Sequence, residues 1–243
     1  MTFDSTTLFS REFLLGTMMG PNCLRILDEL LTRVDLPPKA HVLDLGCGMG
    51  LTSMALARGY GGTVTAADLW IPAADNARRF AEAGLSDRVT AVHCEARALP
   101  FEKESFDAVI SIDAWHYFAA DSAYLTTHLL PLLRPGGLLA VGVPGLRRAF
   151  DAVPGDLRPY WVDGMNFYTL AWWRELCLQC TGLALREAFD MDCHDRAWAE
   201  WLESDNEHAK TDVVMMDMEG GRYFATHGLI CEKIGRASCR ERV

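Results

Sequence analysis

The sequence has no long hydrophobic run and no cluster of basic residues. None of its apolar stretches approaches the ~18 residues needed to cross a bilayer, so we expect no membrane-spanning helix. Lys and Arg number 23 against 33 Asp and Glu, a net charge of −10, and such a surface repels polyanions. Nucleic acids and membranes are therefore not expected as partners. The N-terminal sequence MTFDSTTLFSREF lacks the basic and apolar segments of a secretory signal, which predicts a cytoplasmic protein.

Internal repeats, low-complexity linkers and a disulfide framework are also missing. Half of the 243 residues are hydrophobic and 23% are charged, as in ordinary globular domains. A chain of this length builds its core without disulfides, and eight cysteines without an export signal indicate reduced thiols. Cys177 and Cys180 form one Cys-x-x-Cys pair, but no second pair completes a tetrahedral zinc site. We therefore expect core thiols and no bound metal.

Short apolar runs alternate with amphipathic segments along most of the chain. The predicted strands are 41–45, 63–68, 89–94, 107–112, 137–143, 183–192 and 223–234. The predicted helices are 21–34, a segment ending at residue 58, 72–83 and 121–133. Buried strands that alternate with helices predict a mostly parallel α/β sheet covered on both faces. We expect seven strands in a single domain over residues 1–233.

Three segments fall outside this alternation. Residues 1–36 are expected to form an N-terminal helical cap. Residues 145–182 and 193–221 are rich in aromatic side chains and lie between the late strands, where we expect lid insertions. Packing in the core is the alternative for these aromatic residues. Trp172 and Trp173 are neighbours on a predicted helix, so they cannot face the same way.

The last ten residues, 234–243, are basic and follow a complete apolar run. Their sequence, IGRASCRERV, can be encoded by a nucleotide string that resembles a short-read sequencing adaptor. We expect this segment to be an artefact of sequencing, and a disordered basic tail is the alternative.

A glycine-rich turn follows the first predicted strand, where residues 44–50 read DLGCGMG. Glycines in such a turn let a ligand approach backbone amides at the positive end of the next helix. The dinucleotide fingerprint Gly-x-Gly-x-x-Gly would need its third glycine at position 51, where this chain has Leu51. The spacing therefore disfavours a nicotinamide-dependent oxidoreductase.

Acidic residues stand at the ends of the next three predicted strands. Asp68 ends the second strand, 22 residues after the first glycine of the turn, where a carboxylate can accept ribose hydroxyls. Glu95 follows the third strand and Asp113 the fourth. With the Leu-Arg-Pro-Gly-Gly turn at 133–137, this set resembles class I S-adenosylmethionine-dependent methyltransferases. The resemblance is strong over about residues 38–145 and weak over the rest.

The resemblance implies a Rossmann-like fold, with strand order 3-2-1-4-5-7-6 and an antiparallel last strand, and S-adenosyl-L-methionine as cofactor. The cofactor-binding residues that it implies are Asp44, Gly46, Gly48, Gly50, Asp68, Leu69, Glu95, Ala96 and Asp113. The glycines would pass the methionine part, while Asp44 positions the turn or the ammonium group. Asp68 would bind the ribose, and Leu69 or Trp70 would pack on the adenine. Glu95 stands where the family usually has Asp.

The candidate catalytic residues, Asp113 and His116, follow the fourth predicted strand. The resemblance places Asp113 near the sulfonium and the methyl acceptor. His116, with an ordinary pKa of ~6.5, could take a proton from a hydroxyl, thiol or ammonium acceptor, and a structural hydrogen bond is its alternative role. The predicted function is in-line transfer of a methyl group to a small-molecule amine, thiol or hydroxyl. Within the superfamily the chain looks similar to quinone, sterol and cyclopropane-synthase-like methyltransferases.

Two other functions stay open at this point. In a non-catalytic module that binds S-adenosylmethionine, we would expect Asp44, the glycines or Asp68 to be replaced by other residues. All of them are present. Arsenic or thiol S-methyltransferases also resemble this fold. The arsenic enzymes place a cysteine directly after the fourth strand, where this chain has Asp113-Ala114-Trp115.

Overall fold

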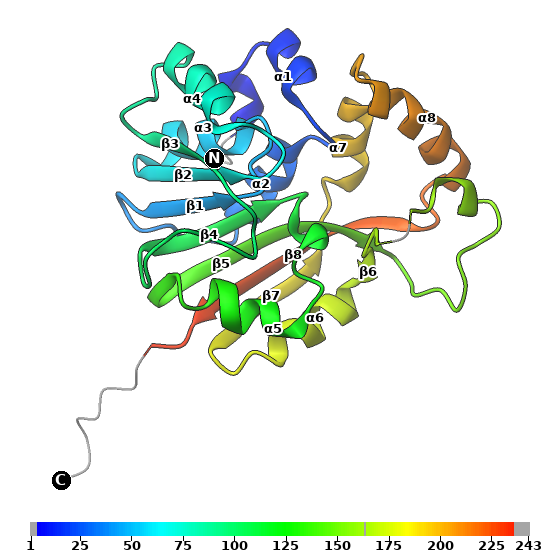
Figure 1. The fold of residues 1–243 in the computed structure, drawn as a ribbon. Coiled ribbons are helices and arrows are strands. Elements are labelled where there is room, and N and C mark those ends of the chain that lie inside the picture. Colours follow the sequence, from blue (N-terminus) through cyan, green and yellow to red (C-terminus); the bar gives the residue numbers. More distant parts are fainter. Residues whose placement is uncertain (1–3, 163, 236–243) are drawn as a thin grey trace.

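The computed structural model describes residues 4–162 and 164–235, which form a central sheet between two helical layers (Figure 1). Its strands are β1 His41–Leu45, β2 Thr63–Asp68, β3 Val89–His93, β4 Phe106–Ile112, β5 Leu133–Leu146, β6 Tyr168–Thr169, β7 Leu183–Asp190 and β8 Phe224–Lys233. Their order is β3-β2-β1-β4-β5-β8-β7, and β6 pairs only with β5. Strands β1 to β5 are parallel, whereas β8 runs antiparallel to β5 and β7. The predicted Rossmann-like sheet is confirmed, with the two-residue β6 as an addition.

The helices follow the predicted positions closely in the first half of the chain. They are α1 Arg11–Thr17, α2 Cys23–Leu31, α3 Leu51–Tyr60, α4 Ala73–Glu82, α5 Ser122–Tyr124, α6 Leu170–Leu178, α7 His194–Trp201 and α8 Glu207–Glu219. Helices α2, α3 and α4 contribute to the hydrophobic cluster on one face of the sheet, and α5 and α6 to the cluster on the other face. Figure 1 shows α3 and α4 near β3 and β2, and α5 and α6 near β7. None of the helices within the described ranges combines the length and hydrophobicity that a bilayer crossing requires.

Two predicted elements near β5 are corrected by the structure. The single helix expected over 121–133 is a short α-helical turn, α5, followed by a π-helical turn at Leu125–Leu129. Strand β5 then begins at Leu133, so the expected turn at 133–137 lies inside the strand. Phe106 pairs with Leu133 and Ala108 with Leu138, so the extra residues bulge out of the ladder.

The strands are buried because each face of the sheet carries its own hydrophobic cluster. Along β4, Ala108 and Ile110 pack on the side of α2 and α3, while Val109 packs on the side of α5 and α6. This alternation follows from the two-residue period of a strand. The nearly continuous apolar sequence of β4 is thus explained by burial on both faces.

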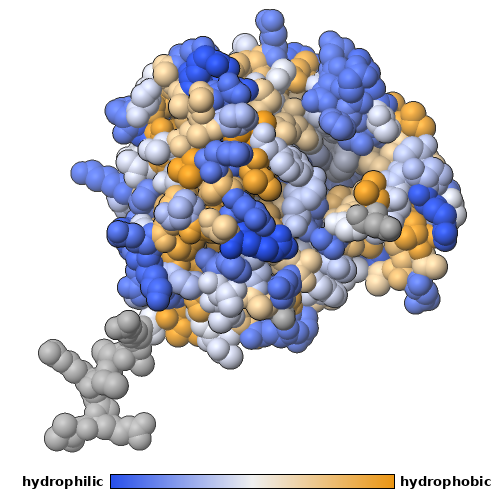
Figure 2. Space-filling view, in the orientation of Figure 1, coloured by the Kyte–Doolittle hydropathy of each residue, from blue (hydrophilic) through white to orange (hydrophobic). Residues whose placement is uncertain are grey.

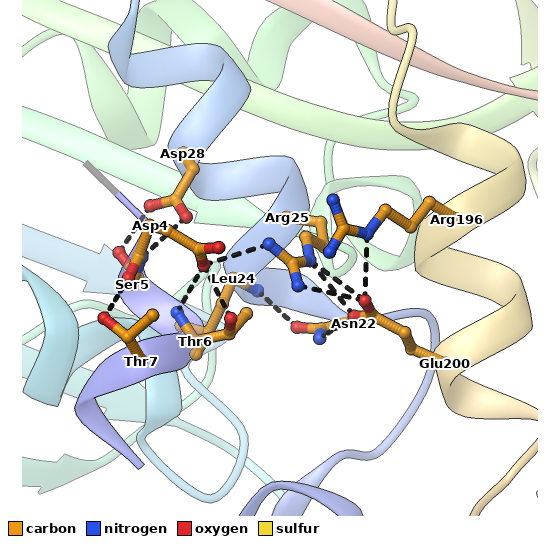
Figure 3. A network of polar contacts seen from close by, with 10 residues as sticks. All are labelled: Asp4, Ser5, Thr6, Thr7, Asn22, Leu24, Arg25, Asp28, Arg196 and Glu200. Carbon is orange, nitrogen blue, oxygen red and sulfur yellow. Dashed lines mark hydrogen bonds and ion pairs between the residues drawn. The ribbon is translucent and has the colours of Figure 1, made fainter. Parts of the chain in front are cut away.

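A polar network joins the N-terminal segment to α2 and α7 (Figure 3). The guanidinium of Arg25 on α2 lies 2.9 Å from Asp4 Oδ1 and 3.0 Å from Glu200 Oε1 on α7. Asn22 caps α2 through a 3.0 Å bond from the Leu24 amide and also donates to Glu200. The network therefore fixes the chain between α1 and α2, which lies over the carboxyl ends of the parallel strands.

The segment 145–182 divides into two parts. Helix α6 packs against β7 and β8, and its Trp173 is fully buried in the hydrophobic cluster on the side of α5 and α6. Trp172 is only partly buried and stacks on Tyr168 with a ring-centroid distance of 3.8 Å. Residues 170–178 of the predicted lid are therefore part of the helical layer.

The artefactual segment that we expect at 234–243 lies almost entirely outside the described residues. Only its first two residues are described, and the Ile234 amide donates to the Gly182 carbonyl at 2.9 Å. Strand β8 ends one residue earlier, at Lys233.

Candidate functional site

A cavity with an empty volume of about 1070 Å³ lies at the carboxyl ends of β1, β2, β3 and β4. The chain between α1 and α2 forms its opposite wall. Figure 2 shows hydrophobic residues scattered between hydrophilic ones on the visible face, which is hollowed beside α8. The predicted site residues that line the cavity are Gly46, Gly48, Asp68, Leu69, Glu95, Ala96 and Asp113. Asp44, Gly50 and His116 do not line it.

The glycine turn between β1 and α3 needs all three of its glycines. Gly46, Gly48 and Gly50 have φ angles of +76°, +53° and +85°, in the left-handed region that favours glycine. A Cβ on Gly46 would lie 2.3 Å from the Ala114 Cβ, so the turn contacts the segment after β4. A Cβ on Gly50 would lie 2.5 Å from the Phe80 ring on α4. Gly50 therefore packs against α4 and does not line the cavity, and its contact with the cofactor stays a prediction.

Asp44 lies beneath this turn and is fully buried. Its Oδ2 accepts hydrogen bonds from the hydroxyls of Thr52, at 2.6 Å, and Ser53, both in the first turn of α3. Its Oδ1 has no partner among the described residues. Burial and the nearby Asp68 raise the pKa of Asp44 to about 6. These contacts favour the loop-positioning role predicted for Asp44 over a direct contact with ligand.

Asp68, at the end of β2, connects the glycine turn to the next turn. Its Oδ2 accepts the Gly48 amide at 2.8 Å, and its Oδ1 accepts the amides of Trp70 and Ile71 at 2.7 and 3.0 Å. An ionised carboxylate has about four acceptor positions, so Oδ2 can still accept a hydroxyl from a ligand. Leu69 and Trp70 follow with exposed fractions of 51% and 60%, and both line the cavity. Their apolar faces are therefore available to a planar ligand.

The wall after β3 is held by hydrogen bonds to its backbone. The Ala96 carbonyl accepts the Tyr124 hydroxyl at 3.0 Å, and Ala96 itself is buried. The exposed Glu95 side chain lies 4.0 Å from Arg97, which also donates to the Phe118 carbonyl at 2.9 Å. Arg97 is thus directed along the wall.

Asp113 follows β4 and has an unusual backbone and an unusual carboxyl group. Its φ of +56° is rare for a residue other than glycine, and its amide donates to the Gly142 carbonyl at 2.8 Å. Its carboxylate has no hydrogen-bond donor within the described ranges and packs so closely on Gly20 that a Cβ there would lie 2.4 Å from Oδ2. Burial and the nearby Asp212 raise the pKa of Asp113 to about 7. This carboxyl group can therefore take up or release a proton near neutral pH.

His116 lies behind the cavity wall. Its ring is buried and packs on Tyr117 and Phe167, with centroid distances of 3.9 and 5.2 Å. Its Nδ1 has no partner in the described part of the chain, and burial lowers the pKa of His116 to about 3. A side chain that binds a proton this weakly is a poor general base at neutral pH. In this structure His116 is a packing residue, and its role as a general base stays a prediction.

Sequence reasoning missed Asp212, which lies on α8. Its Oδ2 accepts the Trp201 indole N–H at 2.8 Å, and burial raises its pKa. Asp212 also raises the pKa values of Asp113 and Tyr117, so it lies near both. An isolated Asp on a helix carries no signal in the sequence. Only the tertiary fold brings α8 close to the residues that follow β4.

Three cysteines, Cys23, Cys47 and Cys94, also line the cavity. Burial raises the pKa of each thiol, so at neutral pH they are protonated. Among the described residues, no group of three or more His, Cys, Asp or Glu is arranged to hold a metal ion.

The sequence of this chain matches a protein-family model and the sequences of several methyltransferases. Residues 42–137 match a family model described as a methyltransferase domain. The chain is 34% identical over 130 residues to methyltransferase GfsG of Streptomyces halstedii, covering 53% of this chain and 46% of that protein. It is 34% identical over 142 residues to the tRNA 5-carboxymethoxyuridine methyltransferase of Escherichia coli, covering 57% and 54%. The matched segment thus spans about half the length of these relatives.

Solved structures match over nearly the whole chain but at low identity. Phosphoethanolamine N-methyltransferase 2 of Haemonchus contortus superposes with a TM-score of 0.72 and 19% identity, covering 95% of this chain and 57% of that one. Geranyl diphosphate C-methyltransferase of Streptomyces coelicolor gives a TM-score of 0.66 and 16% identity, covering 92% and 75%. At such identities the likeness shows the fold alone, and it agrees with the resemblance found in the sequence.

Proposed function

We propose that this chain, whose residues 42–137 match the family model of a methyltransferase domain, methylates a small molecule with S-adenosylmethionine as the methyl donor. The observation that carries the proposal is the cavity at the carboxyl ends of β1 to β4. There the glycine turn and Asp68 form one end and the unpartnered Asp113 forms the other. Open α/β sheets bind their ligands at this edge.

The residues that line the cavity fit S-adenosyl-L-methionine. The free acceptor position of Asp68 Oδ2 suits a ribose hydroxyl, and the exposed faces of Leu69 and Trp70 suit the adenine. Gly46 and Gly48 would leave room for the methionine part beside the N-terminus of α3. When bound, this cofactor supplies a methyl group activated by a positively charged sulfur.

The contribution of the protein would be to align the acceptor with the methyl group and to exclude water. An amine, thiol or hydroxyl acceptor that arrives protonated must also lose a proton. Asp113 faces the cavity and titrates near neutral pH, so we assign it as the acceptor of that proton. His116 lies behind the wall and is assigned no chemical step.

The relatives differ in what they methylate, so the acceptor cannot be transferred from them. By its name, the E. coli relative acts on tRNA, and the structural neighbours act on phosphoethanolamine and geranyl diphosphate. We propose a small molecule because the net charge of −10 and the acidic residues around the cavity disfavour a polyanion. A tRNA acceptor is the competing outcome of the test.

The test is transfer of a labelled methyl group from S-adenosylmethionine by the full chain. Amines, thiols, phenols and tRNA serve as acceptors, and Asp68→Asn serves as the impaired variant. The matched control is Asp87→Asn, which changes an exposed acid outside the cavity. We expect a small molecule to be labelled by the wild type and the control, and much more slowly by Asp68→Asn. Binding of the cofactor without transfer to any acceptor would favour a non-catalytic module, and labelling of tRNA alone would overturn the small-molecule assignment.

A further inference from the structure

We propose that the methyl acceptor is a protonated amine, bound at the Asp113 end of the cavity, where Asp212 supplies a second negative charge and Tyr117 an aromatic face. This inference rests on the proposed methyl transfer and names the acceptor class.

No basic side chain of the described residues that line the cavity pairs with Asp113. The charged residues that line the cavity are Asp68, Glu95, Arg97 and Asp113. Asp68 accepts hydrogen bonds from three backbone amides. Arg97 donates to the Phe118 carbonyl and lies near Glu95. Within the described ranges Asp113 has neither a donor nor an ion pair. A partly buried carboxylate without a partner is costly, and a ligand cation removes that cost.

The groups that act on Asp113 come from several elements and none is basic. Gly20, before α2, packs against its carboxylate, while Cys23 on α2, Tyr117 after β4 and Asp212 on α8 interact with it electrostatically. Asp212 is held in place by the Trp201 indole N–H at 2.8 Å. A neutral hydroxyl or thiol acceptor would not offset the repulsion between the carboxylates of Asp113 and Asp212. A bound cation would be attracted by both carboxylates and would offset that repulsion.

Tyr117 adds a surface that suits the same ligand. Its side chain lines the cavity, is half exposed, and contacts Trp70 edge-on with a centroid distance of 4.8 Å. Burial, Asp113 and Asp212 raise its pKa to about 12, so the ring stays neutral. Cations bind favourably to the faces of neutral aromatic rings. Tyr117 therefore complements the two acids.

The proton balance of the reaction also fits. The amine binds as an ammonium ion, and one N–H proton moves to the ionised Asp113. The freed nitrogen lone pair forms the new bond to the methyl carbon, while the sulfur–methyl bond breaks and leaves its electron pair on sulfur. The product is a methylated ammonium ion, and Asp113 then releases its proton to solvent.

Calorimetry with two ligands of the same shape tests the inference without catalysis. The full chain, saturated with S-adenosylhomocysteine, is titrated with benzylamine and with benzyl alcohol. We expect benzylamine to bind at least about tenfold more tightly, and Asp113→Asn to abolish most of that preference, because a charged hydrogen bond is lost. Asp212→Asn should reduce the preference by a smaller factor. Asp217→Asn, an exposed acid on the same helix, is the matched control and should leave it unchanged.

A second arm follows protons with benzyltrimethylammonium, whose charge does not depend on pH. Its affinity should rise between pH 6 and 8 as Asp113 ionises, with proton release on binding near pH 7. Asp113→Asn should show neither effect. If Asp113→Asn does not fold, the comparison of wild type with Asp212→Asn tests the inference instead. Equal affinity for benzylamine and benzyl alcohol, or an unchanged preference in Asp113→Asn, would overturn the inference. Failure of S-adenosylhomocysteine to bind at all would instead refute the proposed function.

Discussion

Replacing Asp113 by Asn tests how strongly the folded chain perturbs this carboxyl group. Folding raises the pKa of Asp113 from 3.8 to about 7, because the group is buried and lies near Asp212. The folded state then holds a proton that the unfolded state releases, so stability is highest below pH 4 and falls as pH rises through 7. At about 1.4 kcal/mol per pH unit, the rise corresponds to a loss on the order of 4 kcal/mol, which is an upper bound. Asn lacks this charge and suits the positive φ, so the variant should not show the loss.

The assay is equilibrium urea unfolding of wild type and variant at intervals between pH 4 and 8. Subtracting the two free energies of unfolding removes the contribution of Asp44, which both proteins share. We expect the wild type to lose stability relative to Asp113→Asn as pH rises through this range. Asp87→Asn should run parallel to the wild type, because that side chain is exposed. A difference between wild type and Asp113→Asn that does not change with pH would refute the assignment of a buried, unpaired carboxyl group.

Further substitutions test the other contacts of the site. Asp68→Asn should weaken the binding of S-adenosylhomocysteine by at least about tenfold in a calorimetric titration, since an amide replaces a charged acceptor. His116→Gln should leave the pH midpoint of methyl transfer unchanged, and a shifted midpoint would restore His116 to a chemical role. Trp201→Phe removes the hydrogen bond to Asp212 and should lower the free energy of urea unfolding by about 1–3 kcal/mol. Arg25→Met leaves Asp4 and Glu200 without their shared partner and should cost about 2 kcal/mol in the same assay, with faster hydrogen exchange at residues 17–21.

The half of the fold that binds the cofactor could be predicted because its signals are local. Each strand from 41 to 112 is an apolar run bounded by glycine, proline or an acid, and these runs correspond closely to β1 to β4. The turn after β1 needs positive φ at three positions, so the glycines themselves mark it. Local chemistry of this kind predicts both the element and its place in the site.

The remaining part depends on contacts between distant segments, which leave little trace in the sequence. Asp212 acts on Asp113 electrostatically, although the two residues lie on distant segments of the chain. His116 follows the correct strand, yet the packing of Tyr117 and Phe167 buries it away from the cavity. Gly50 belongs to the motif by spacing, but Phe80 on α4 occupies the space beside it. For His116 and Gly50 the position along the chain was informative, but tertiary packing decided what surrounds each residue. For Asp212 even the position carried no signal.

The proposal that this cavity holds S-adenosylmethionine is tested most directly by calorimetric titration of the full chain with S-adenosylhomocysteine. The structure predicts one site with micromolar affinity, weakened in Asp68→Asn and unchanged in Asp87→Asn. A nicotinamide dinucleotide titrated into the same sample should give no binding, because Leu51 replaces the glycine that such a ligand requires. No binding of S-adenosylhomocysteine to a sample that unfolds cooperatively, or equal binding by wild type and Asp68→Asn, would contradict the assignment of the site.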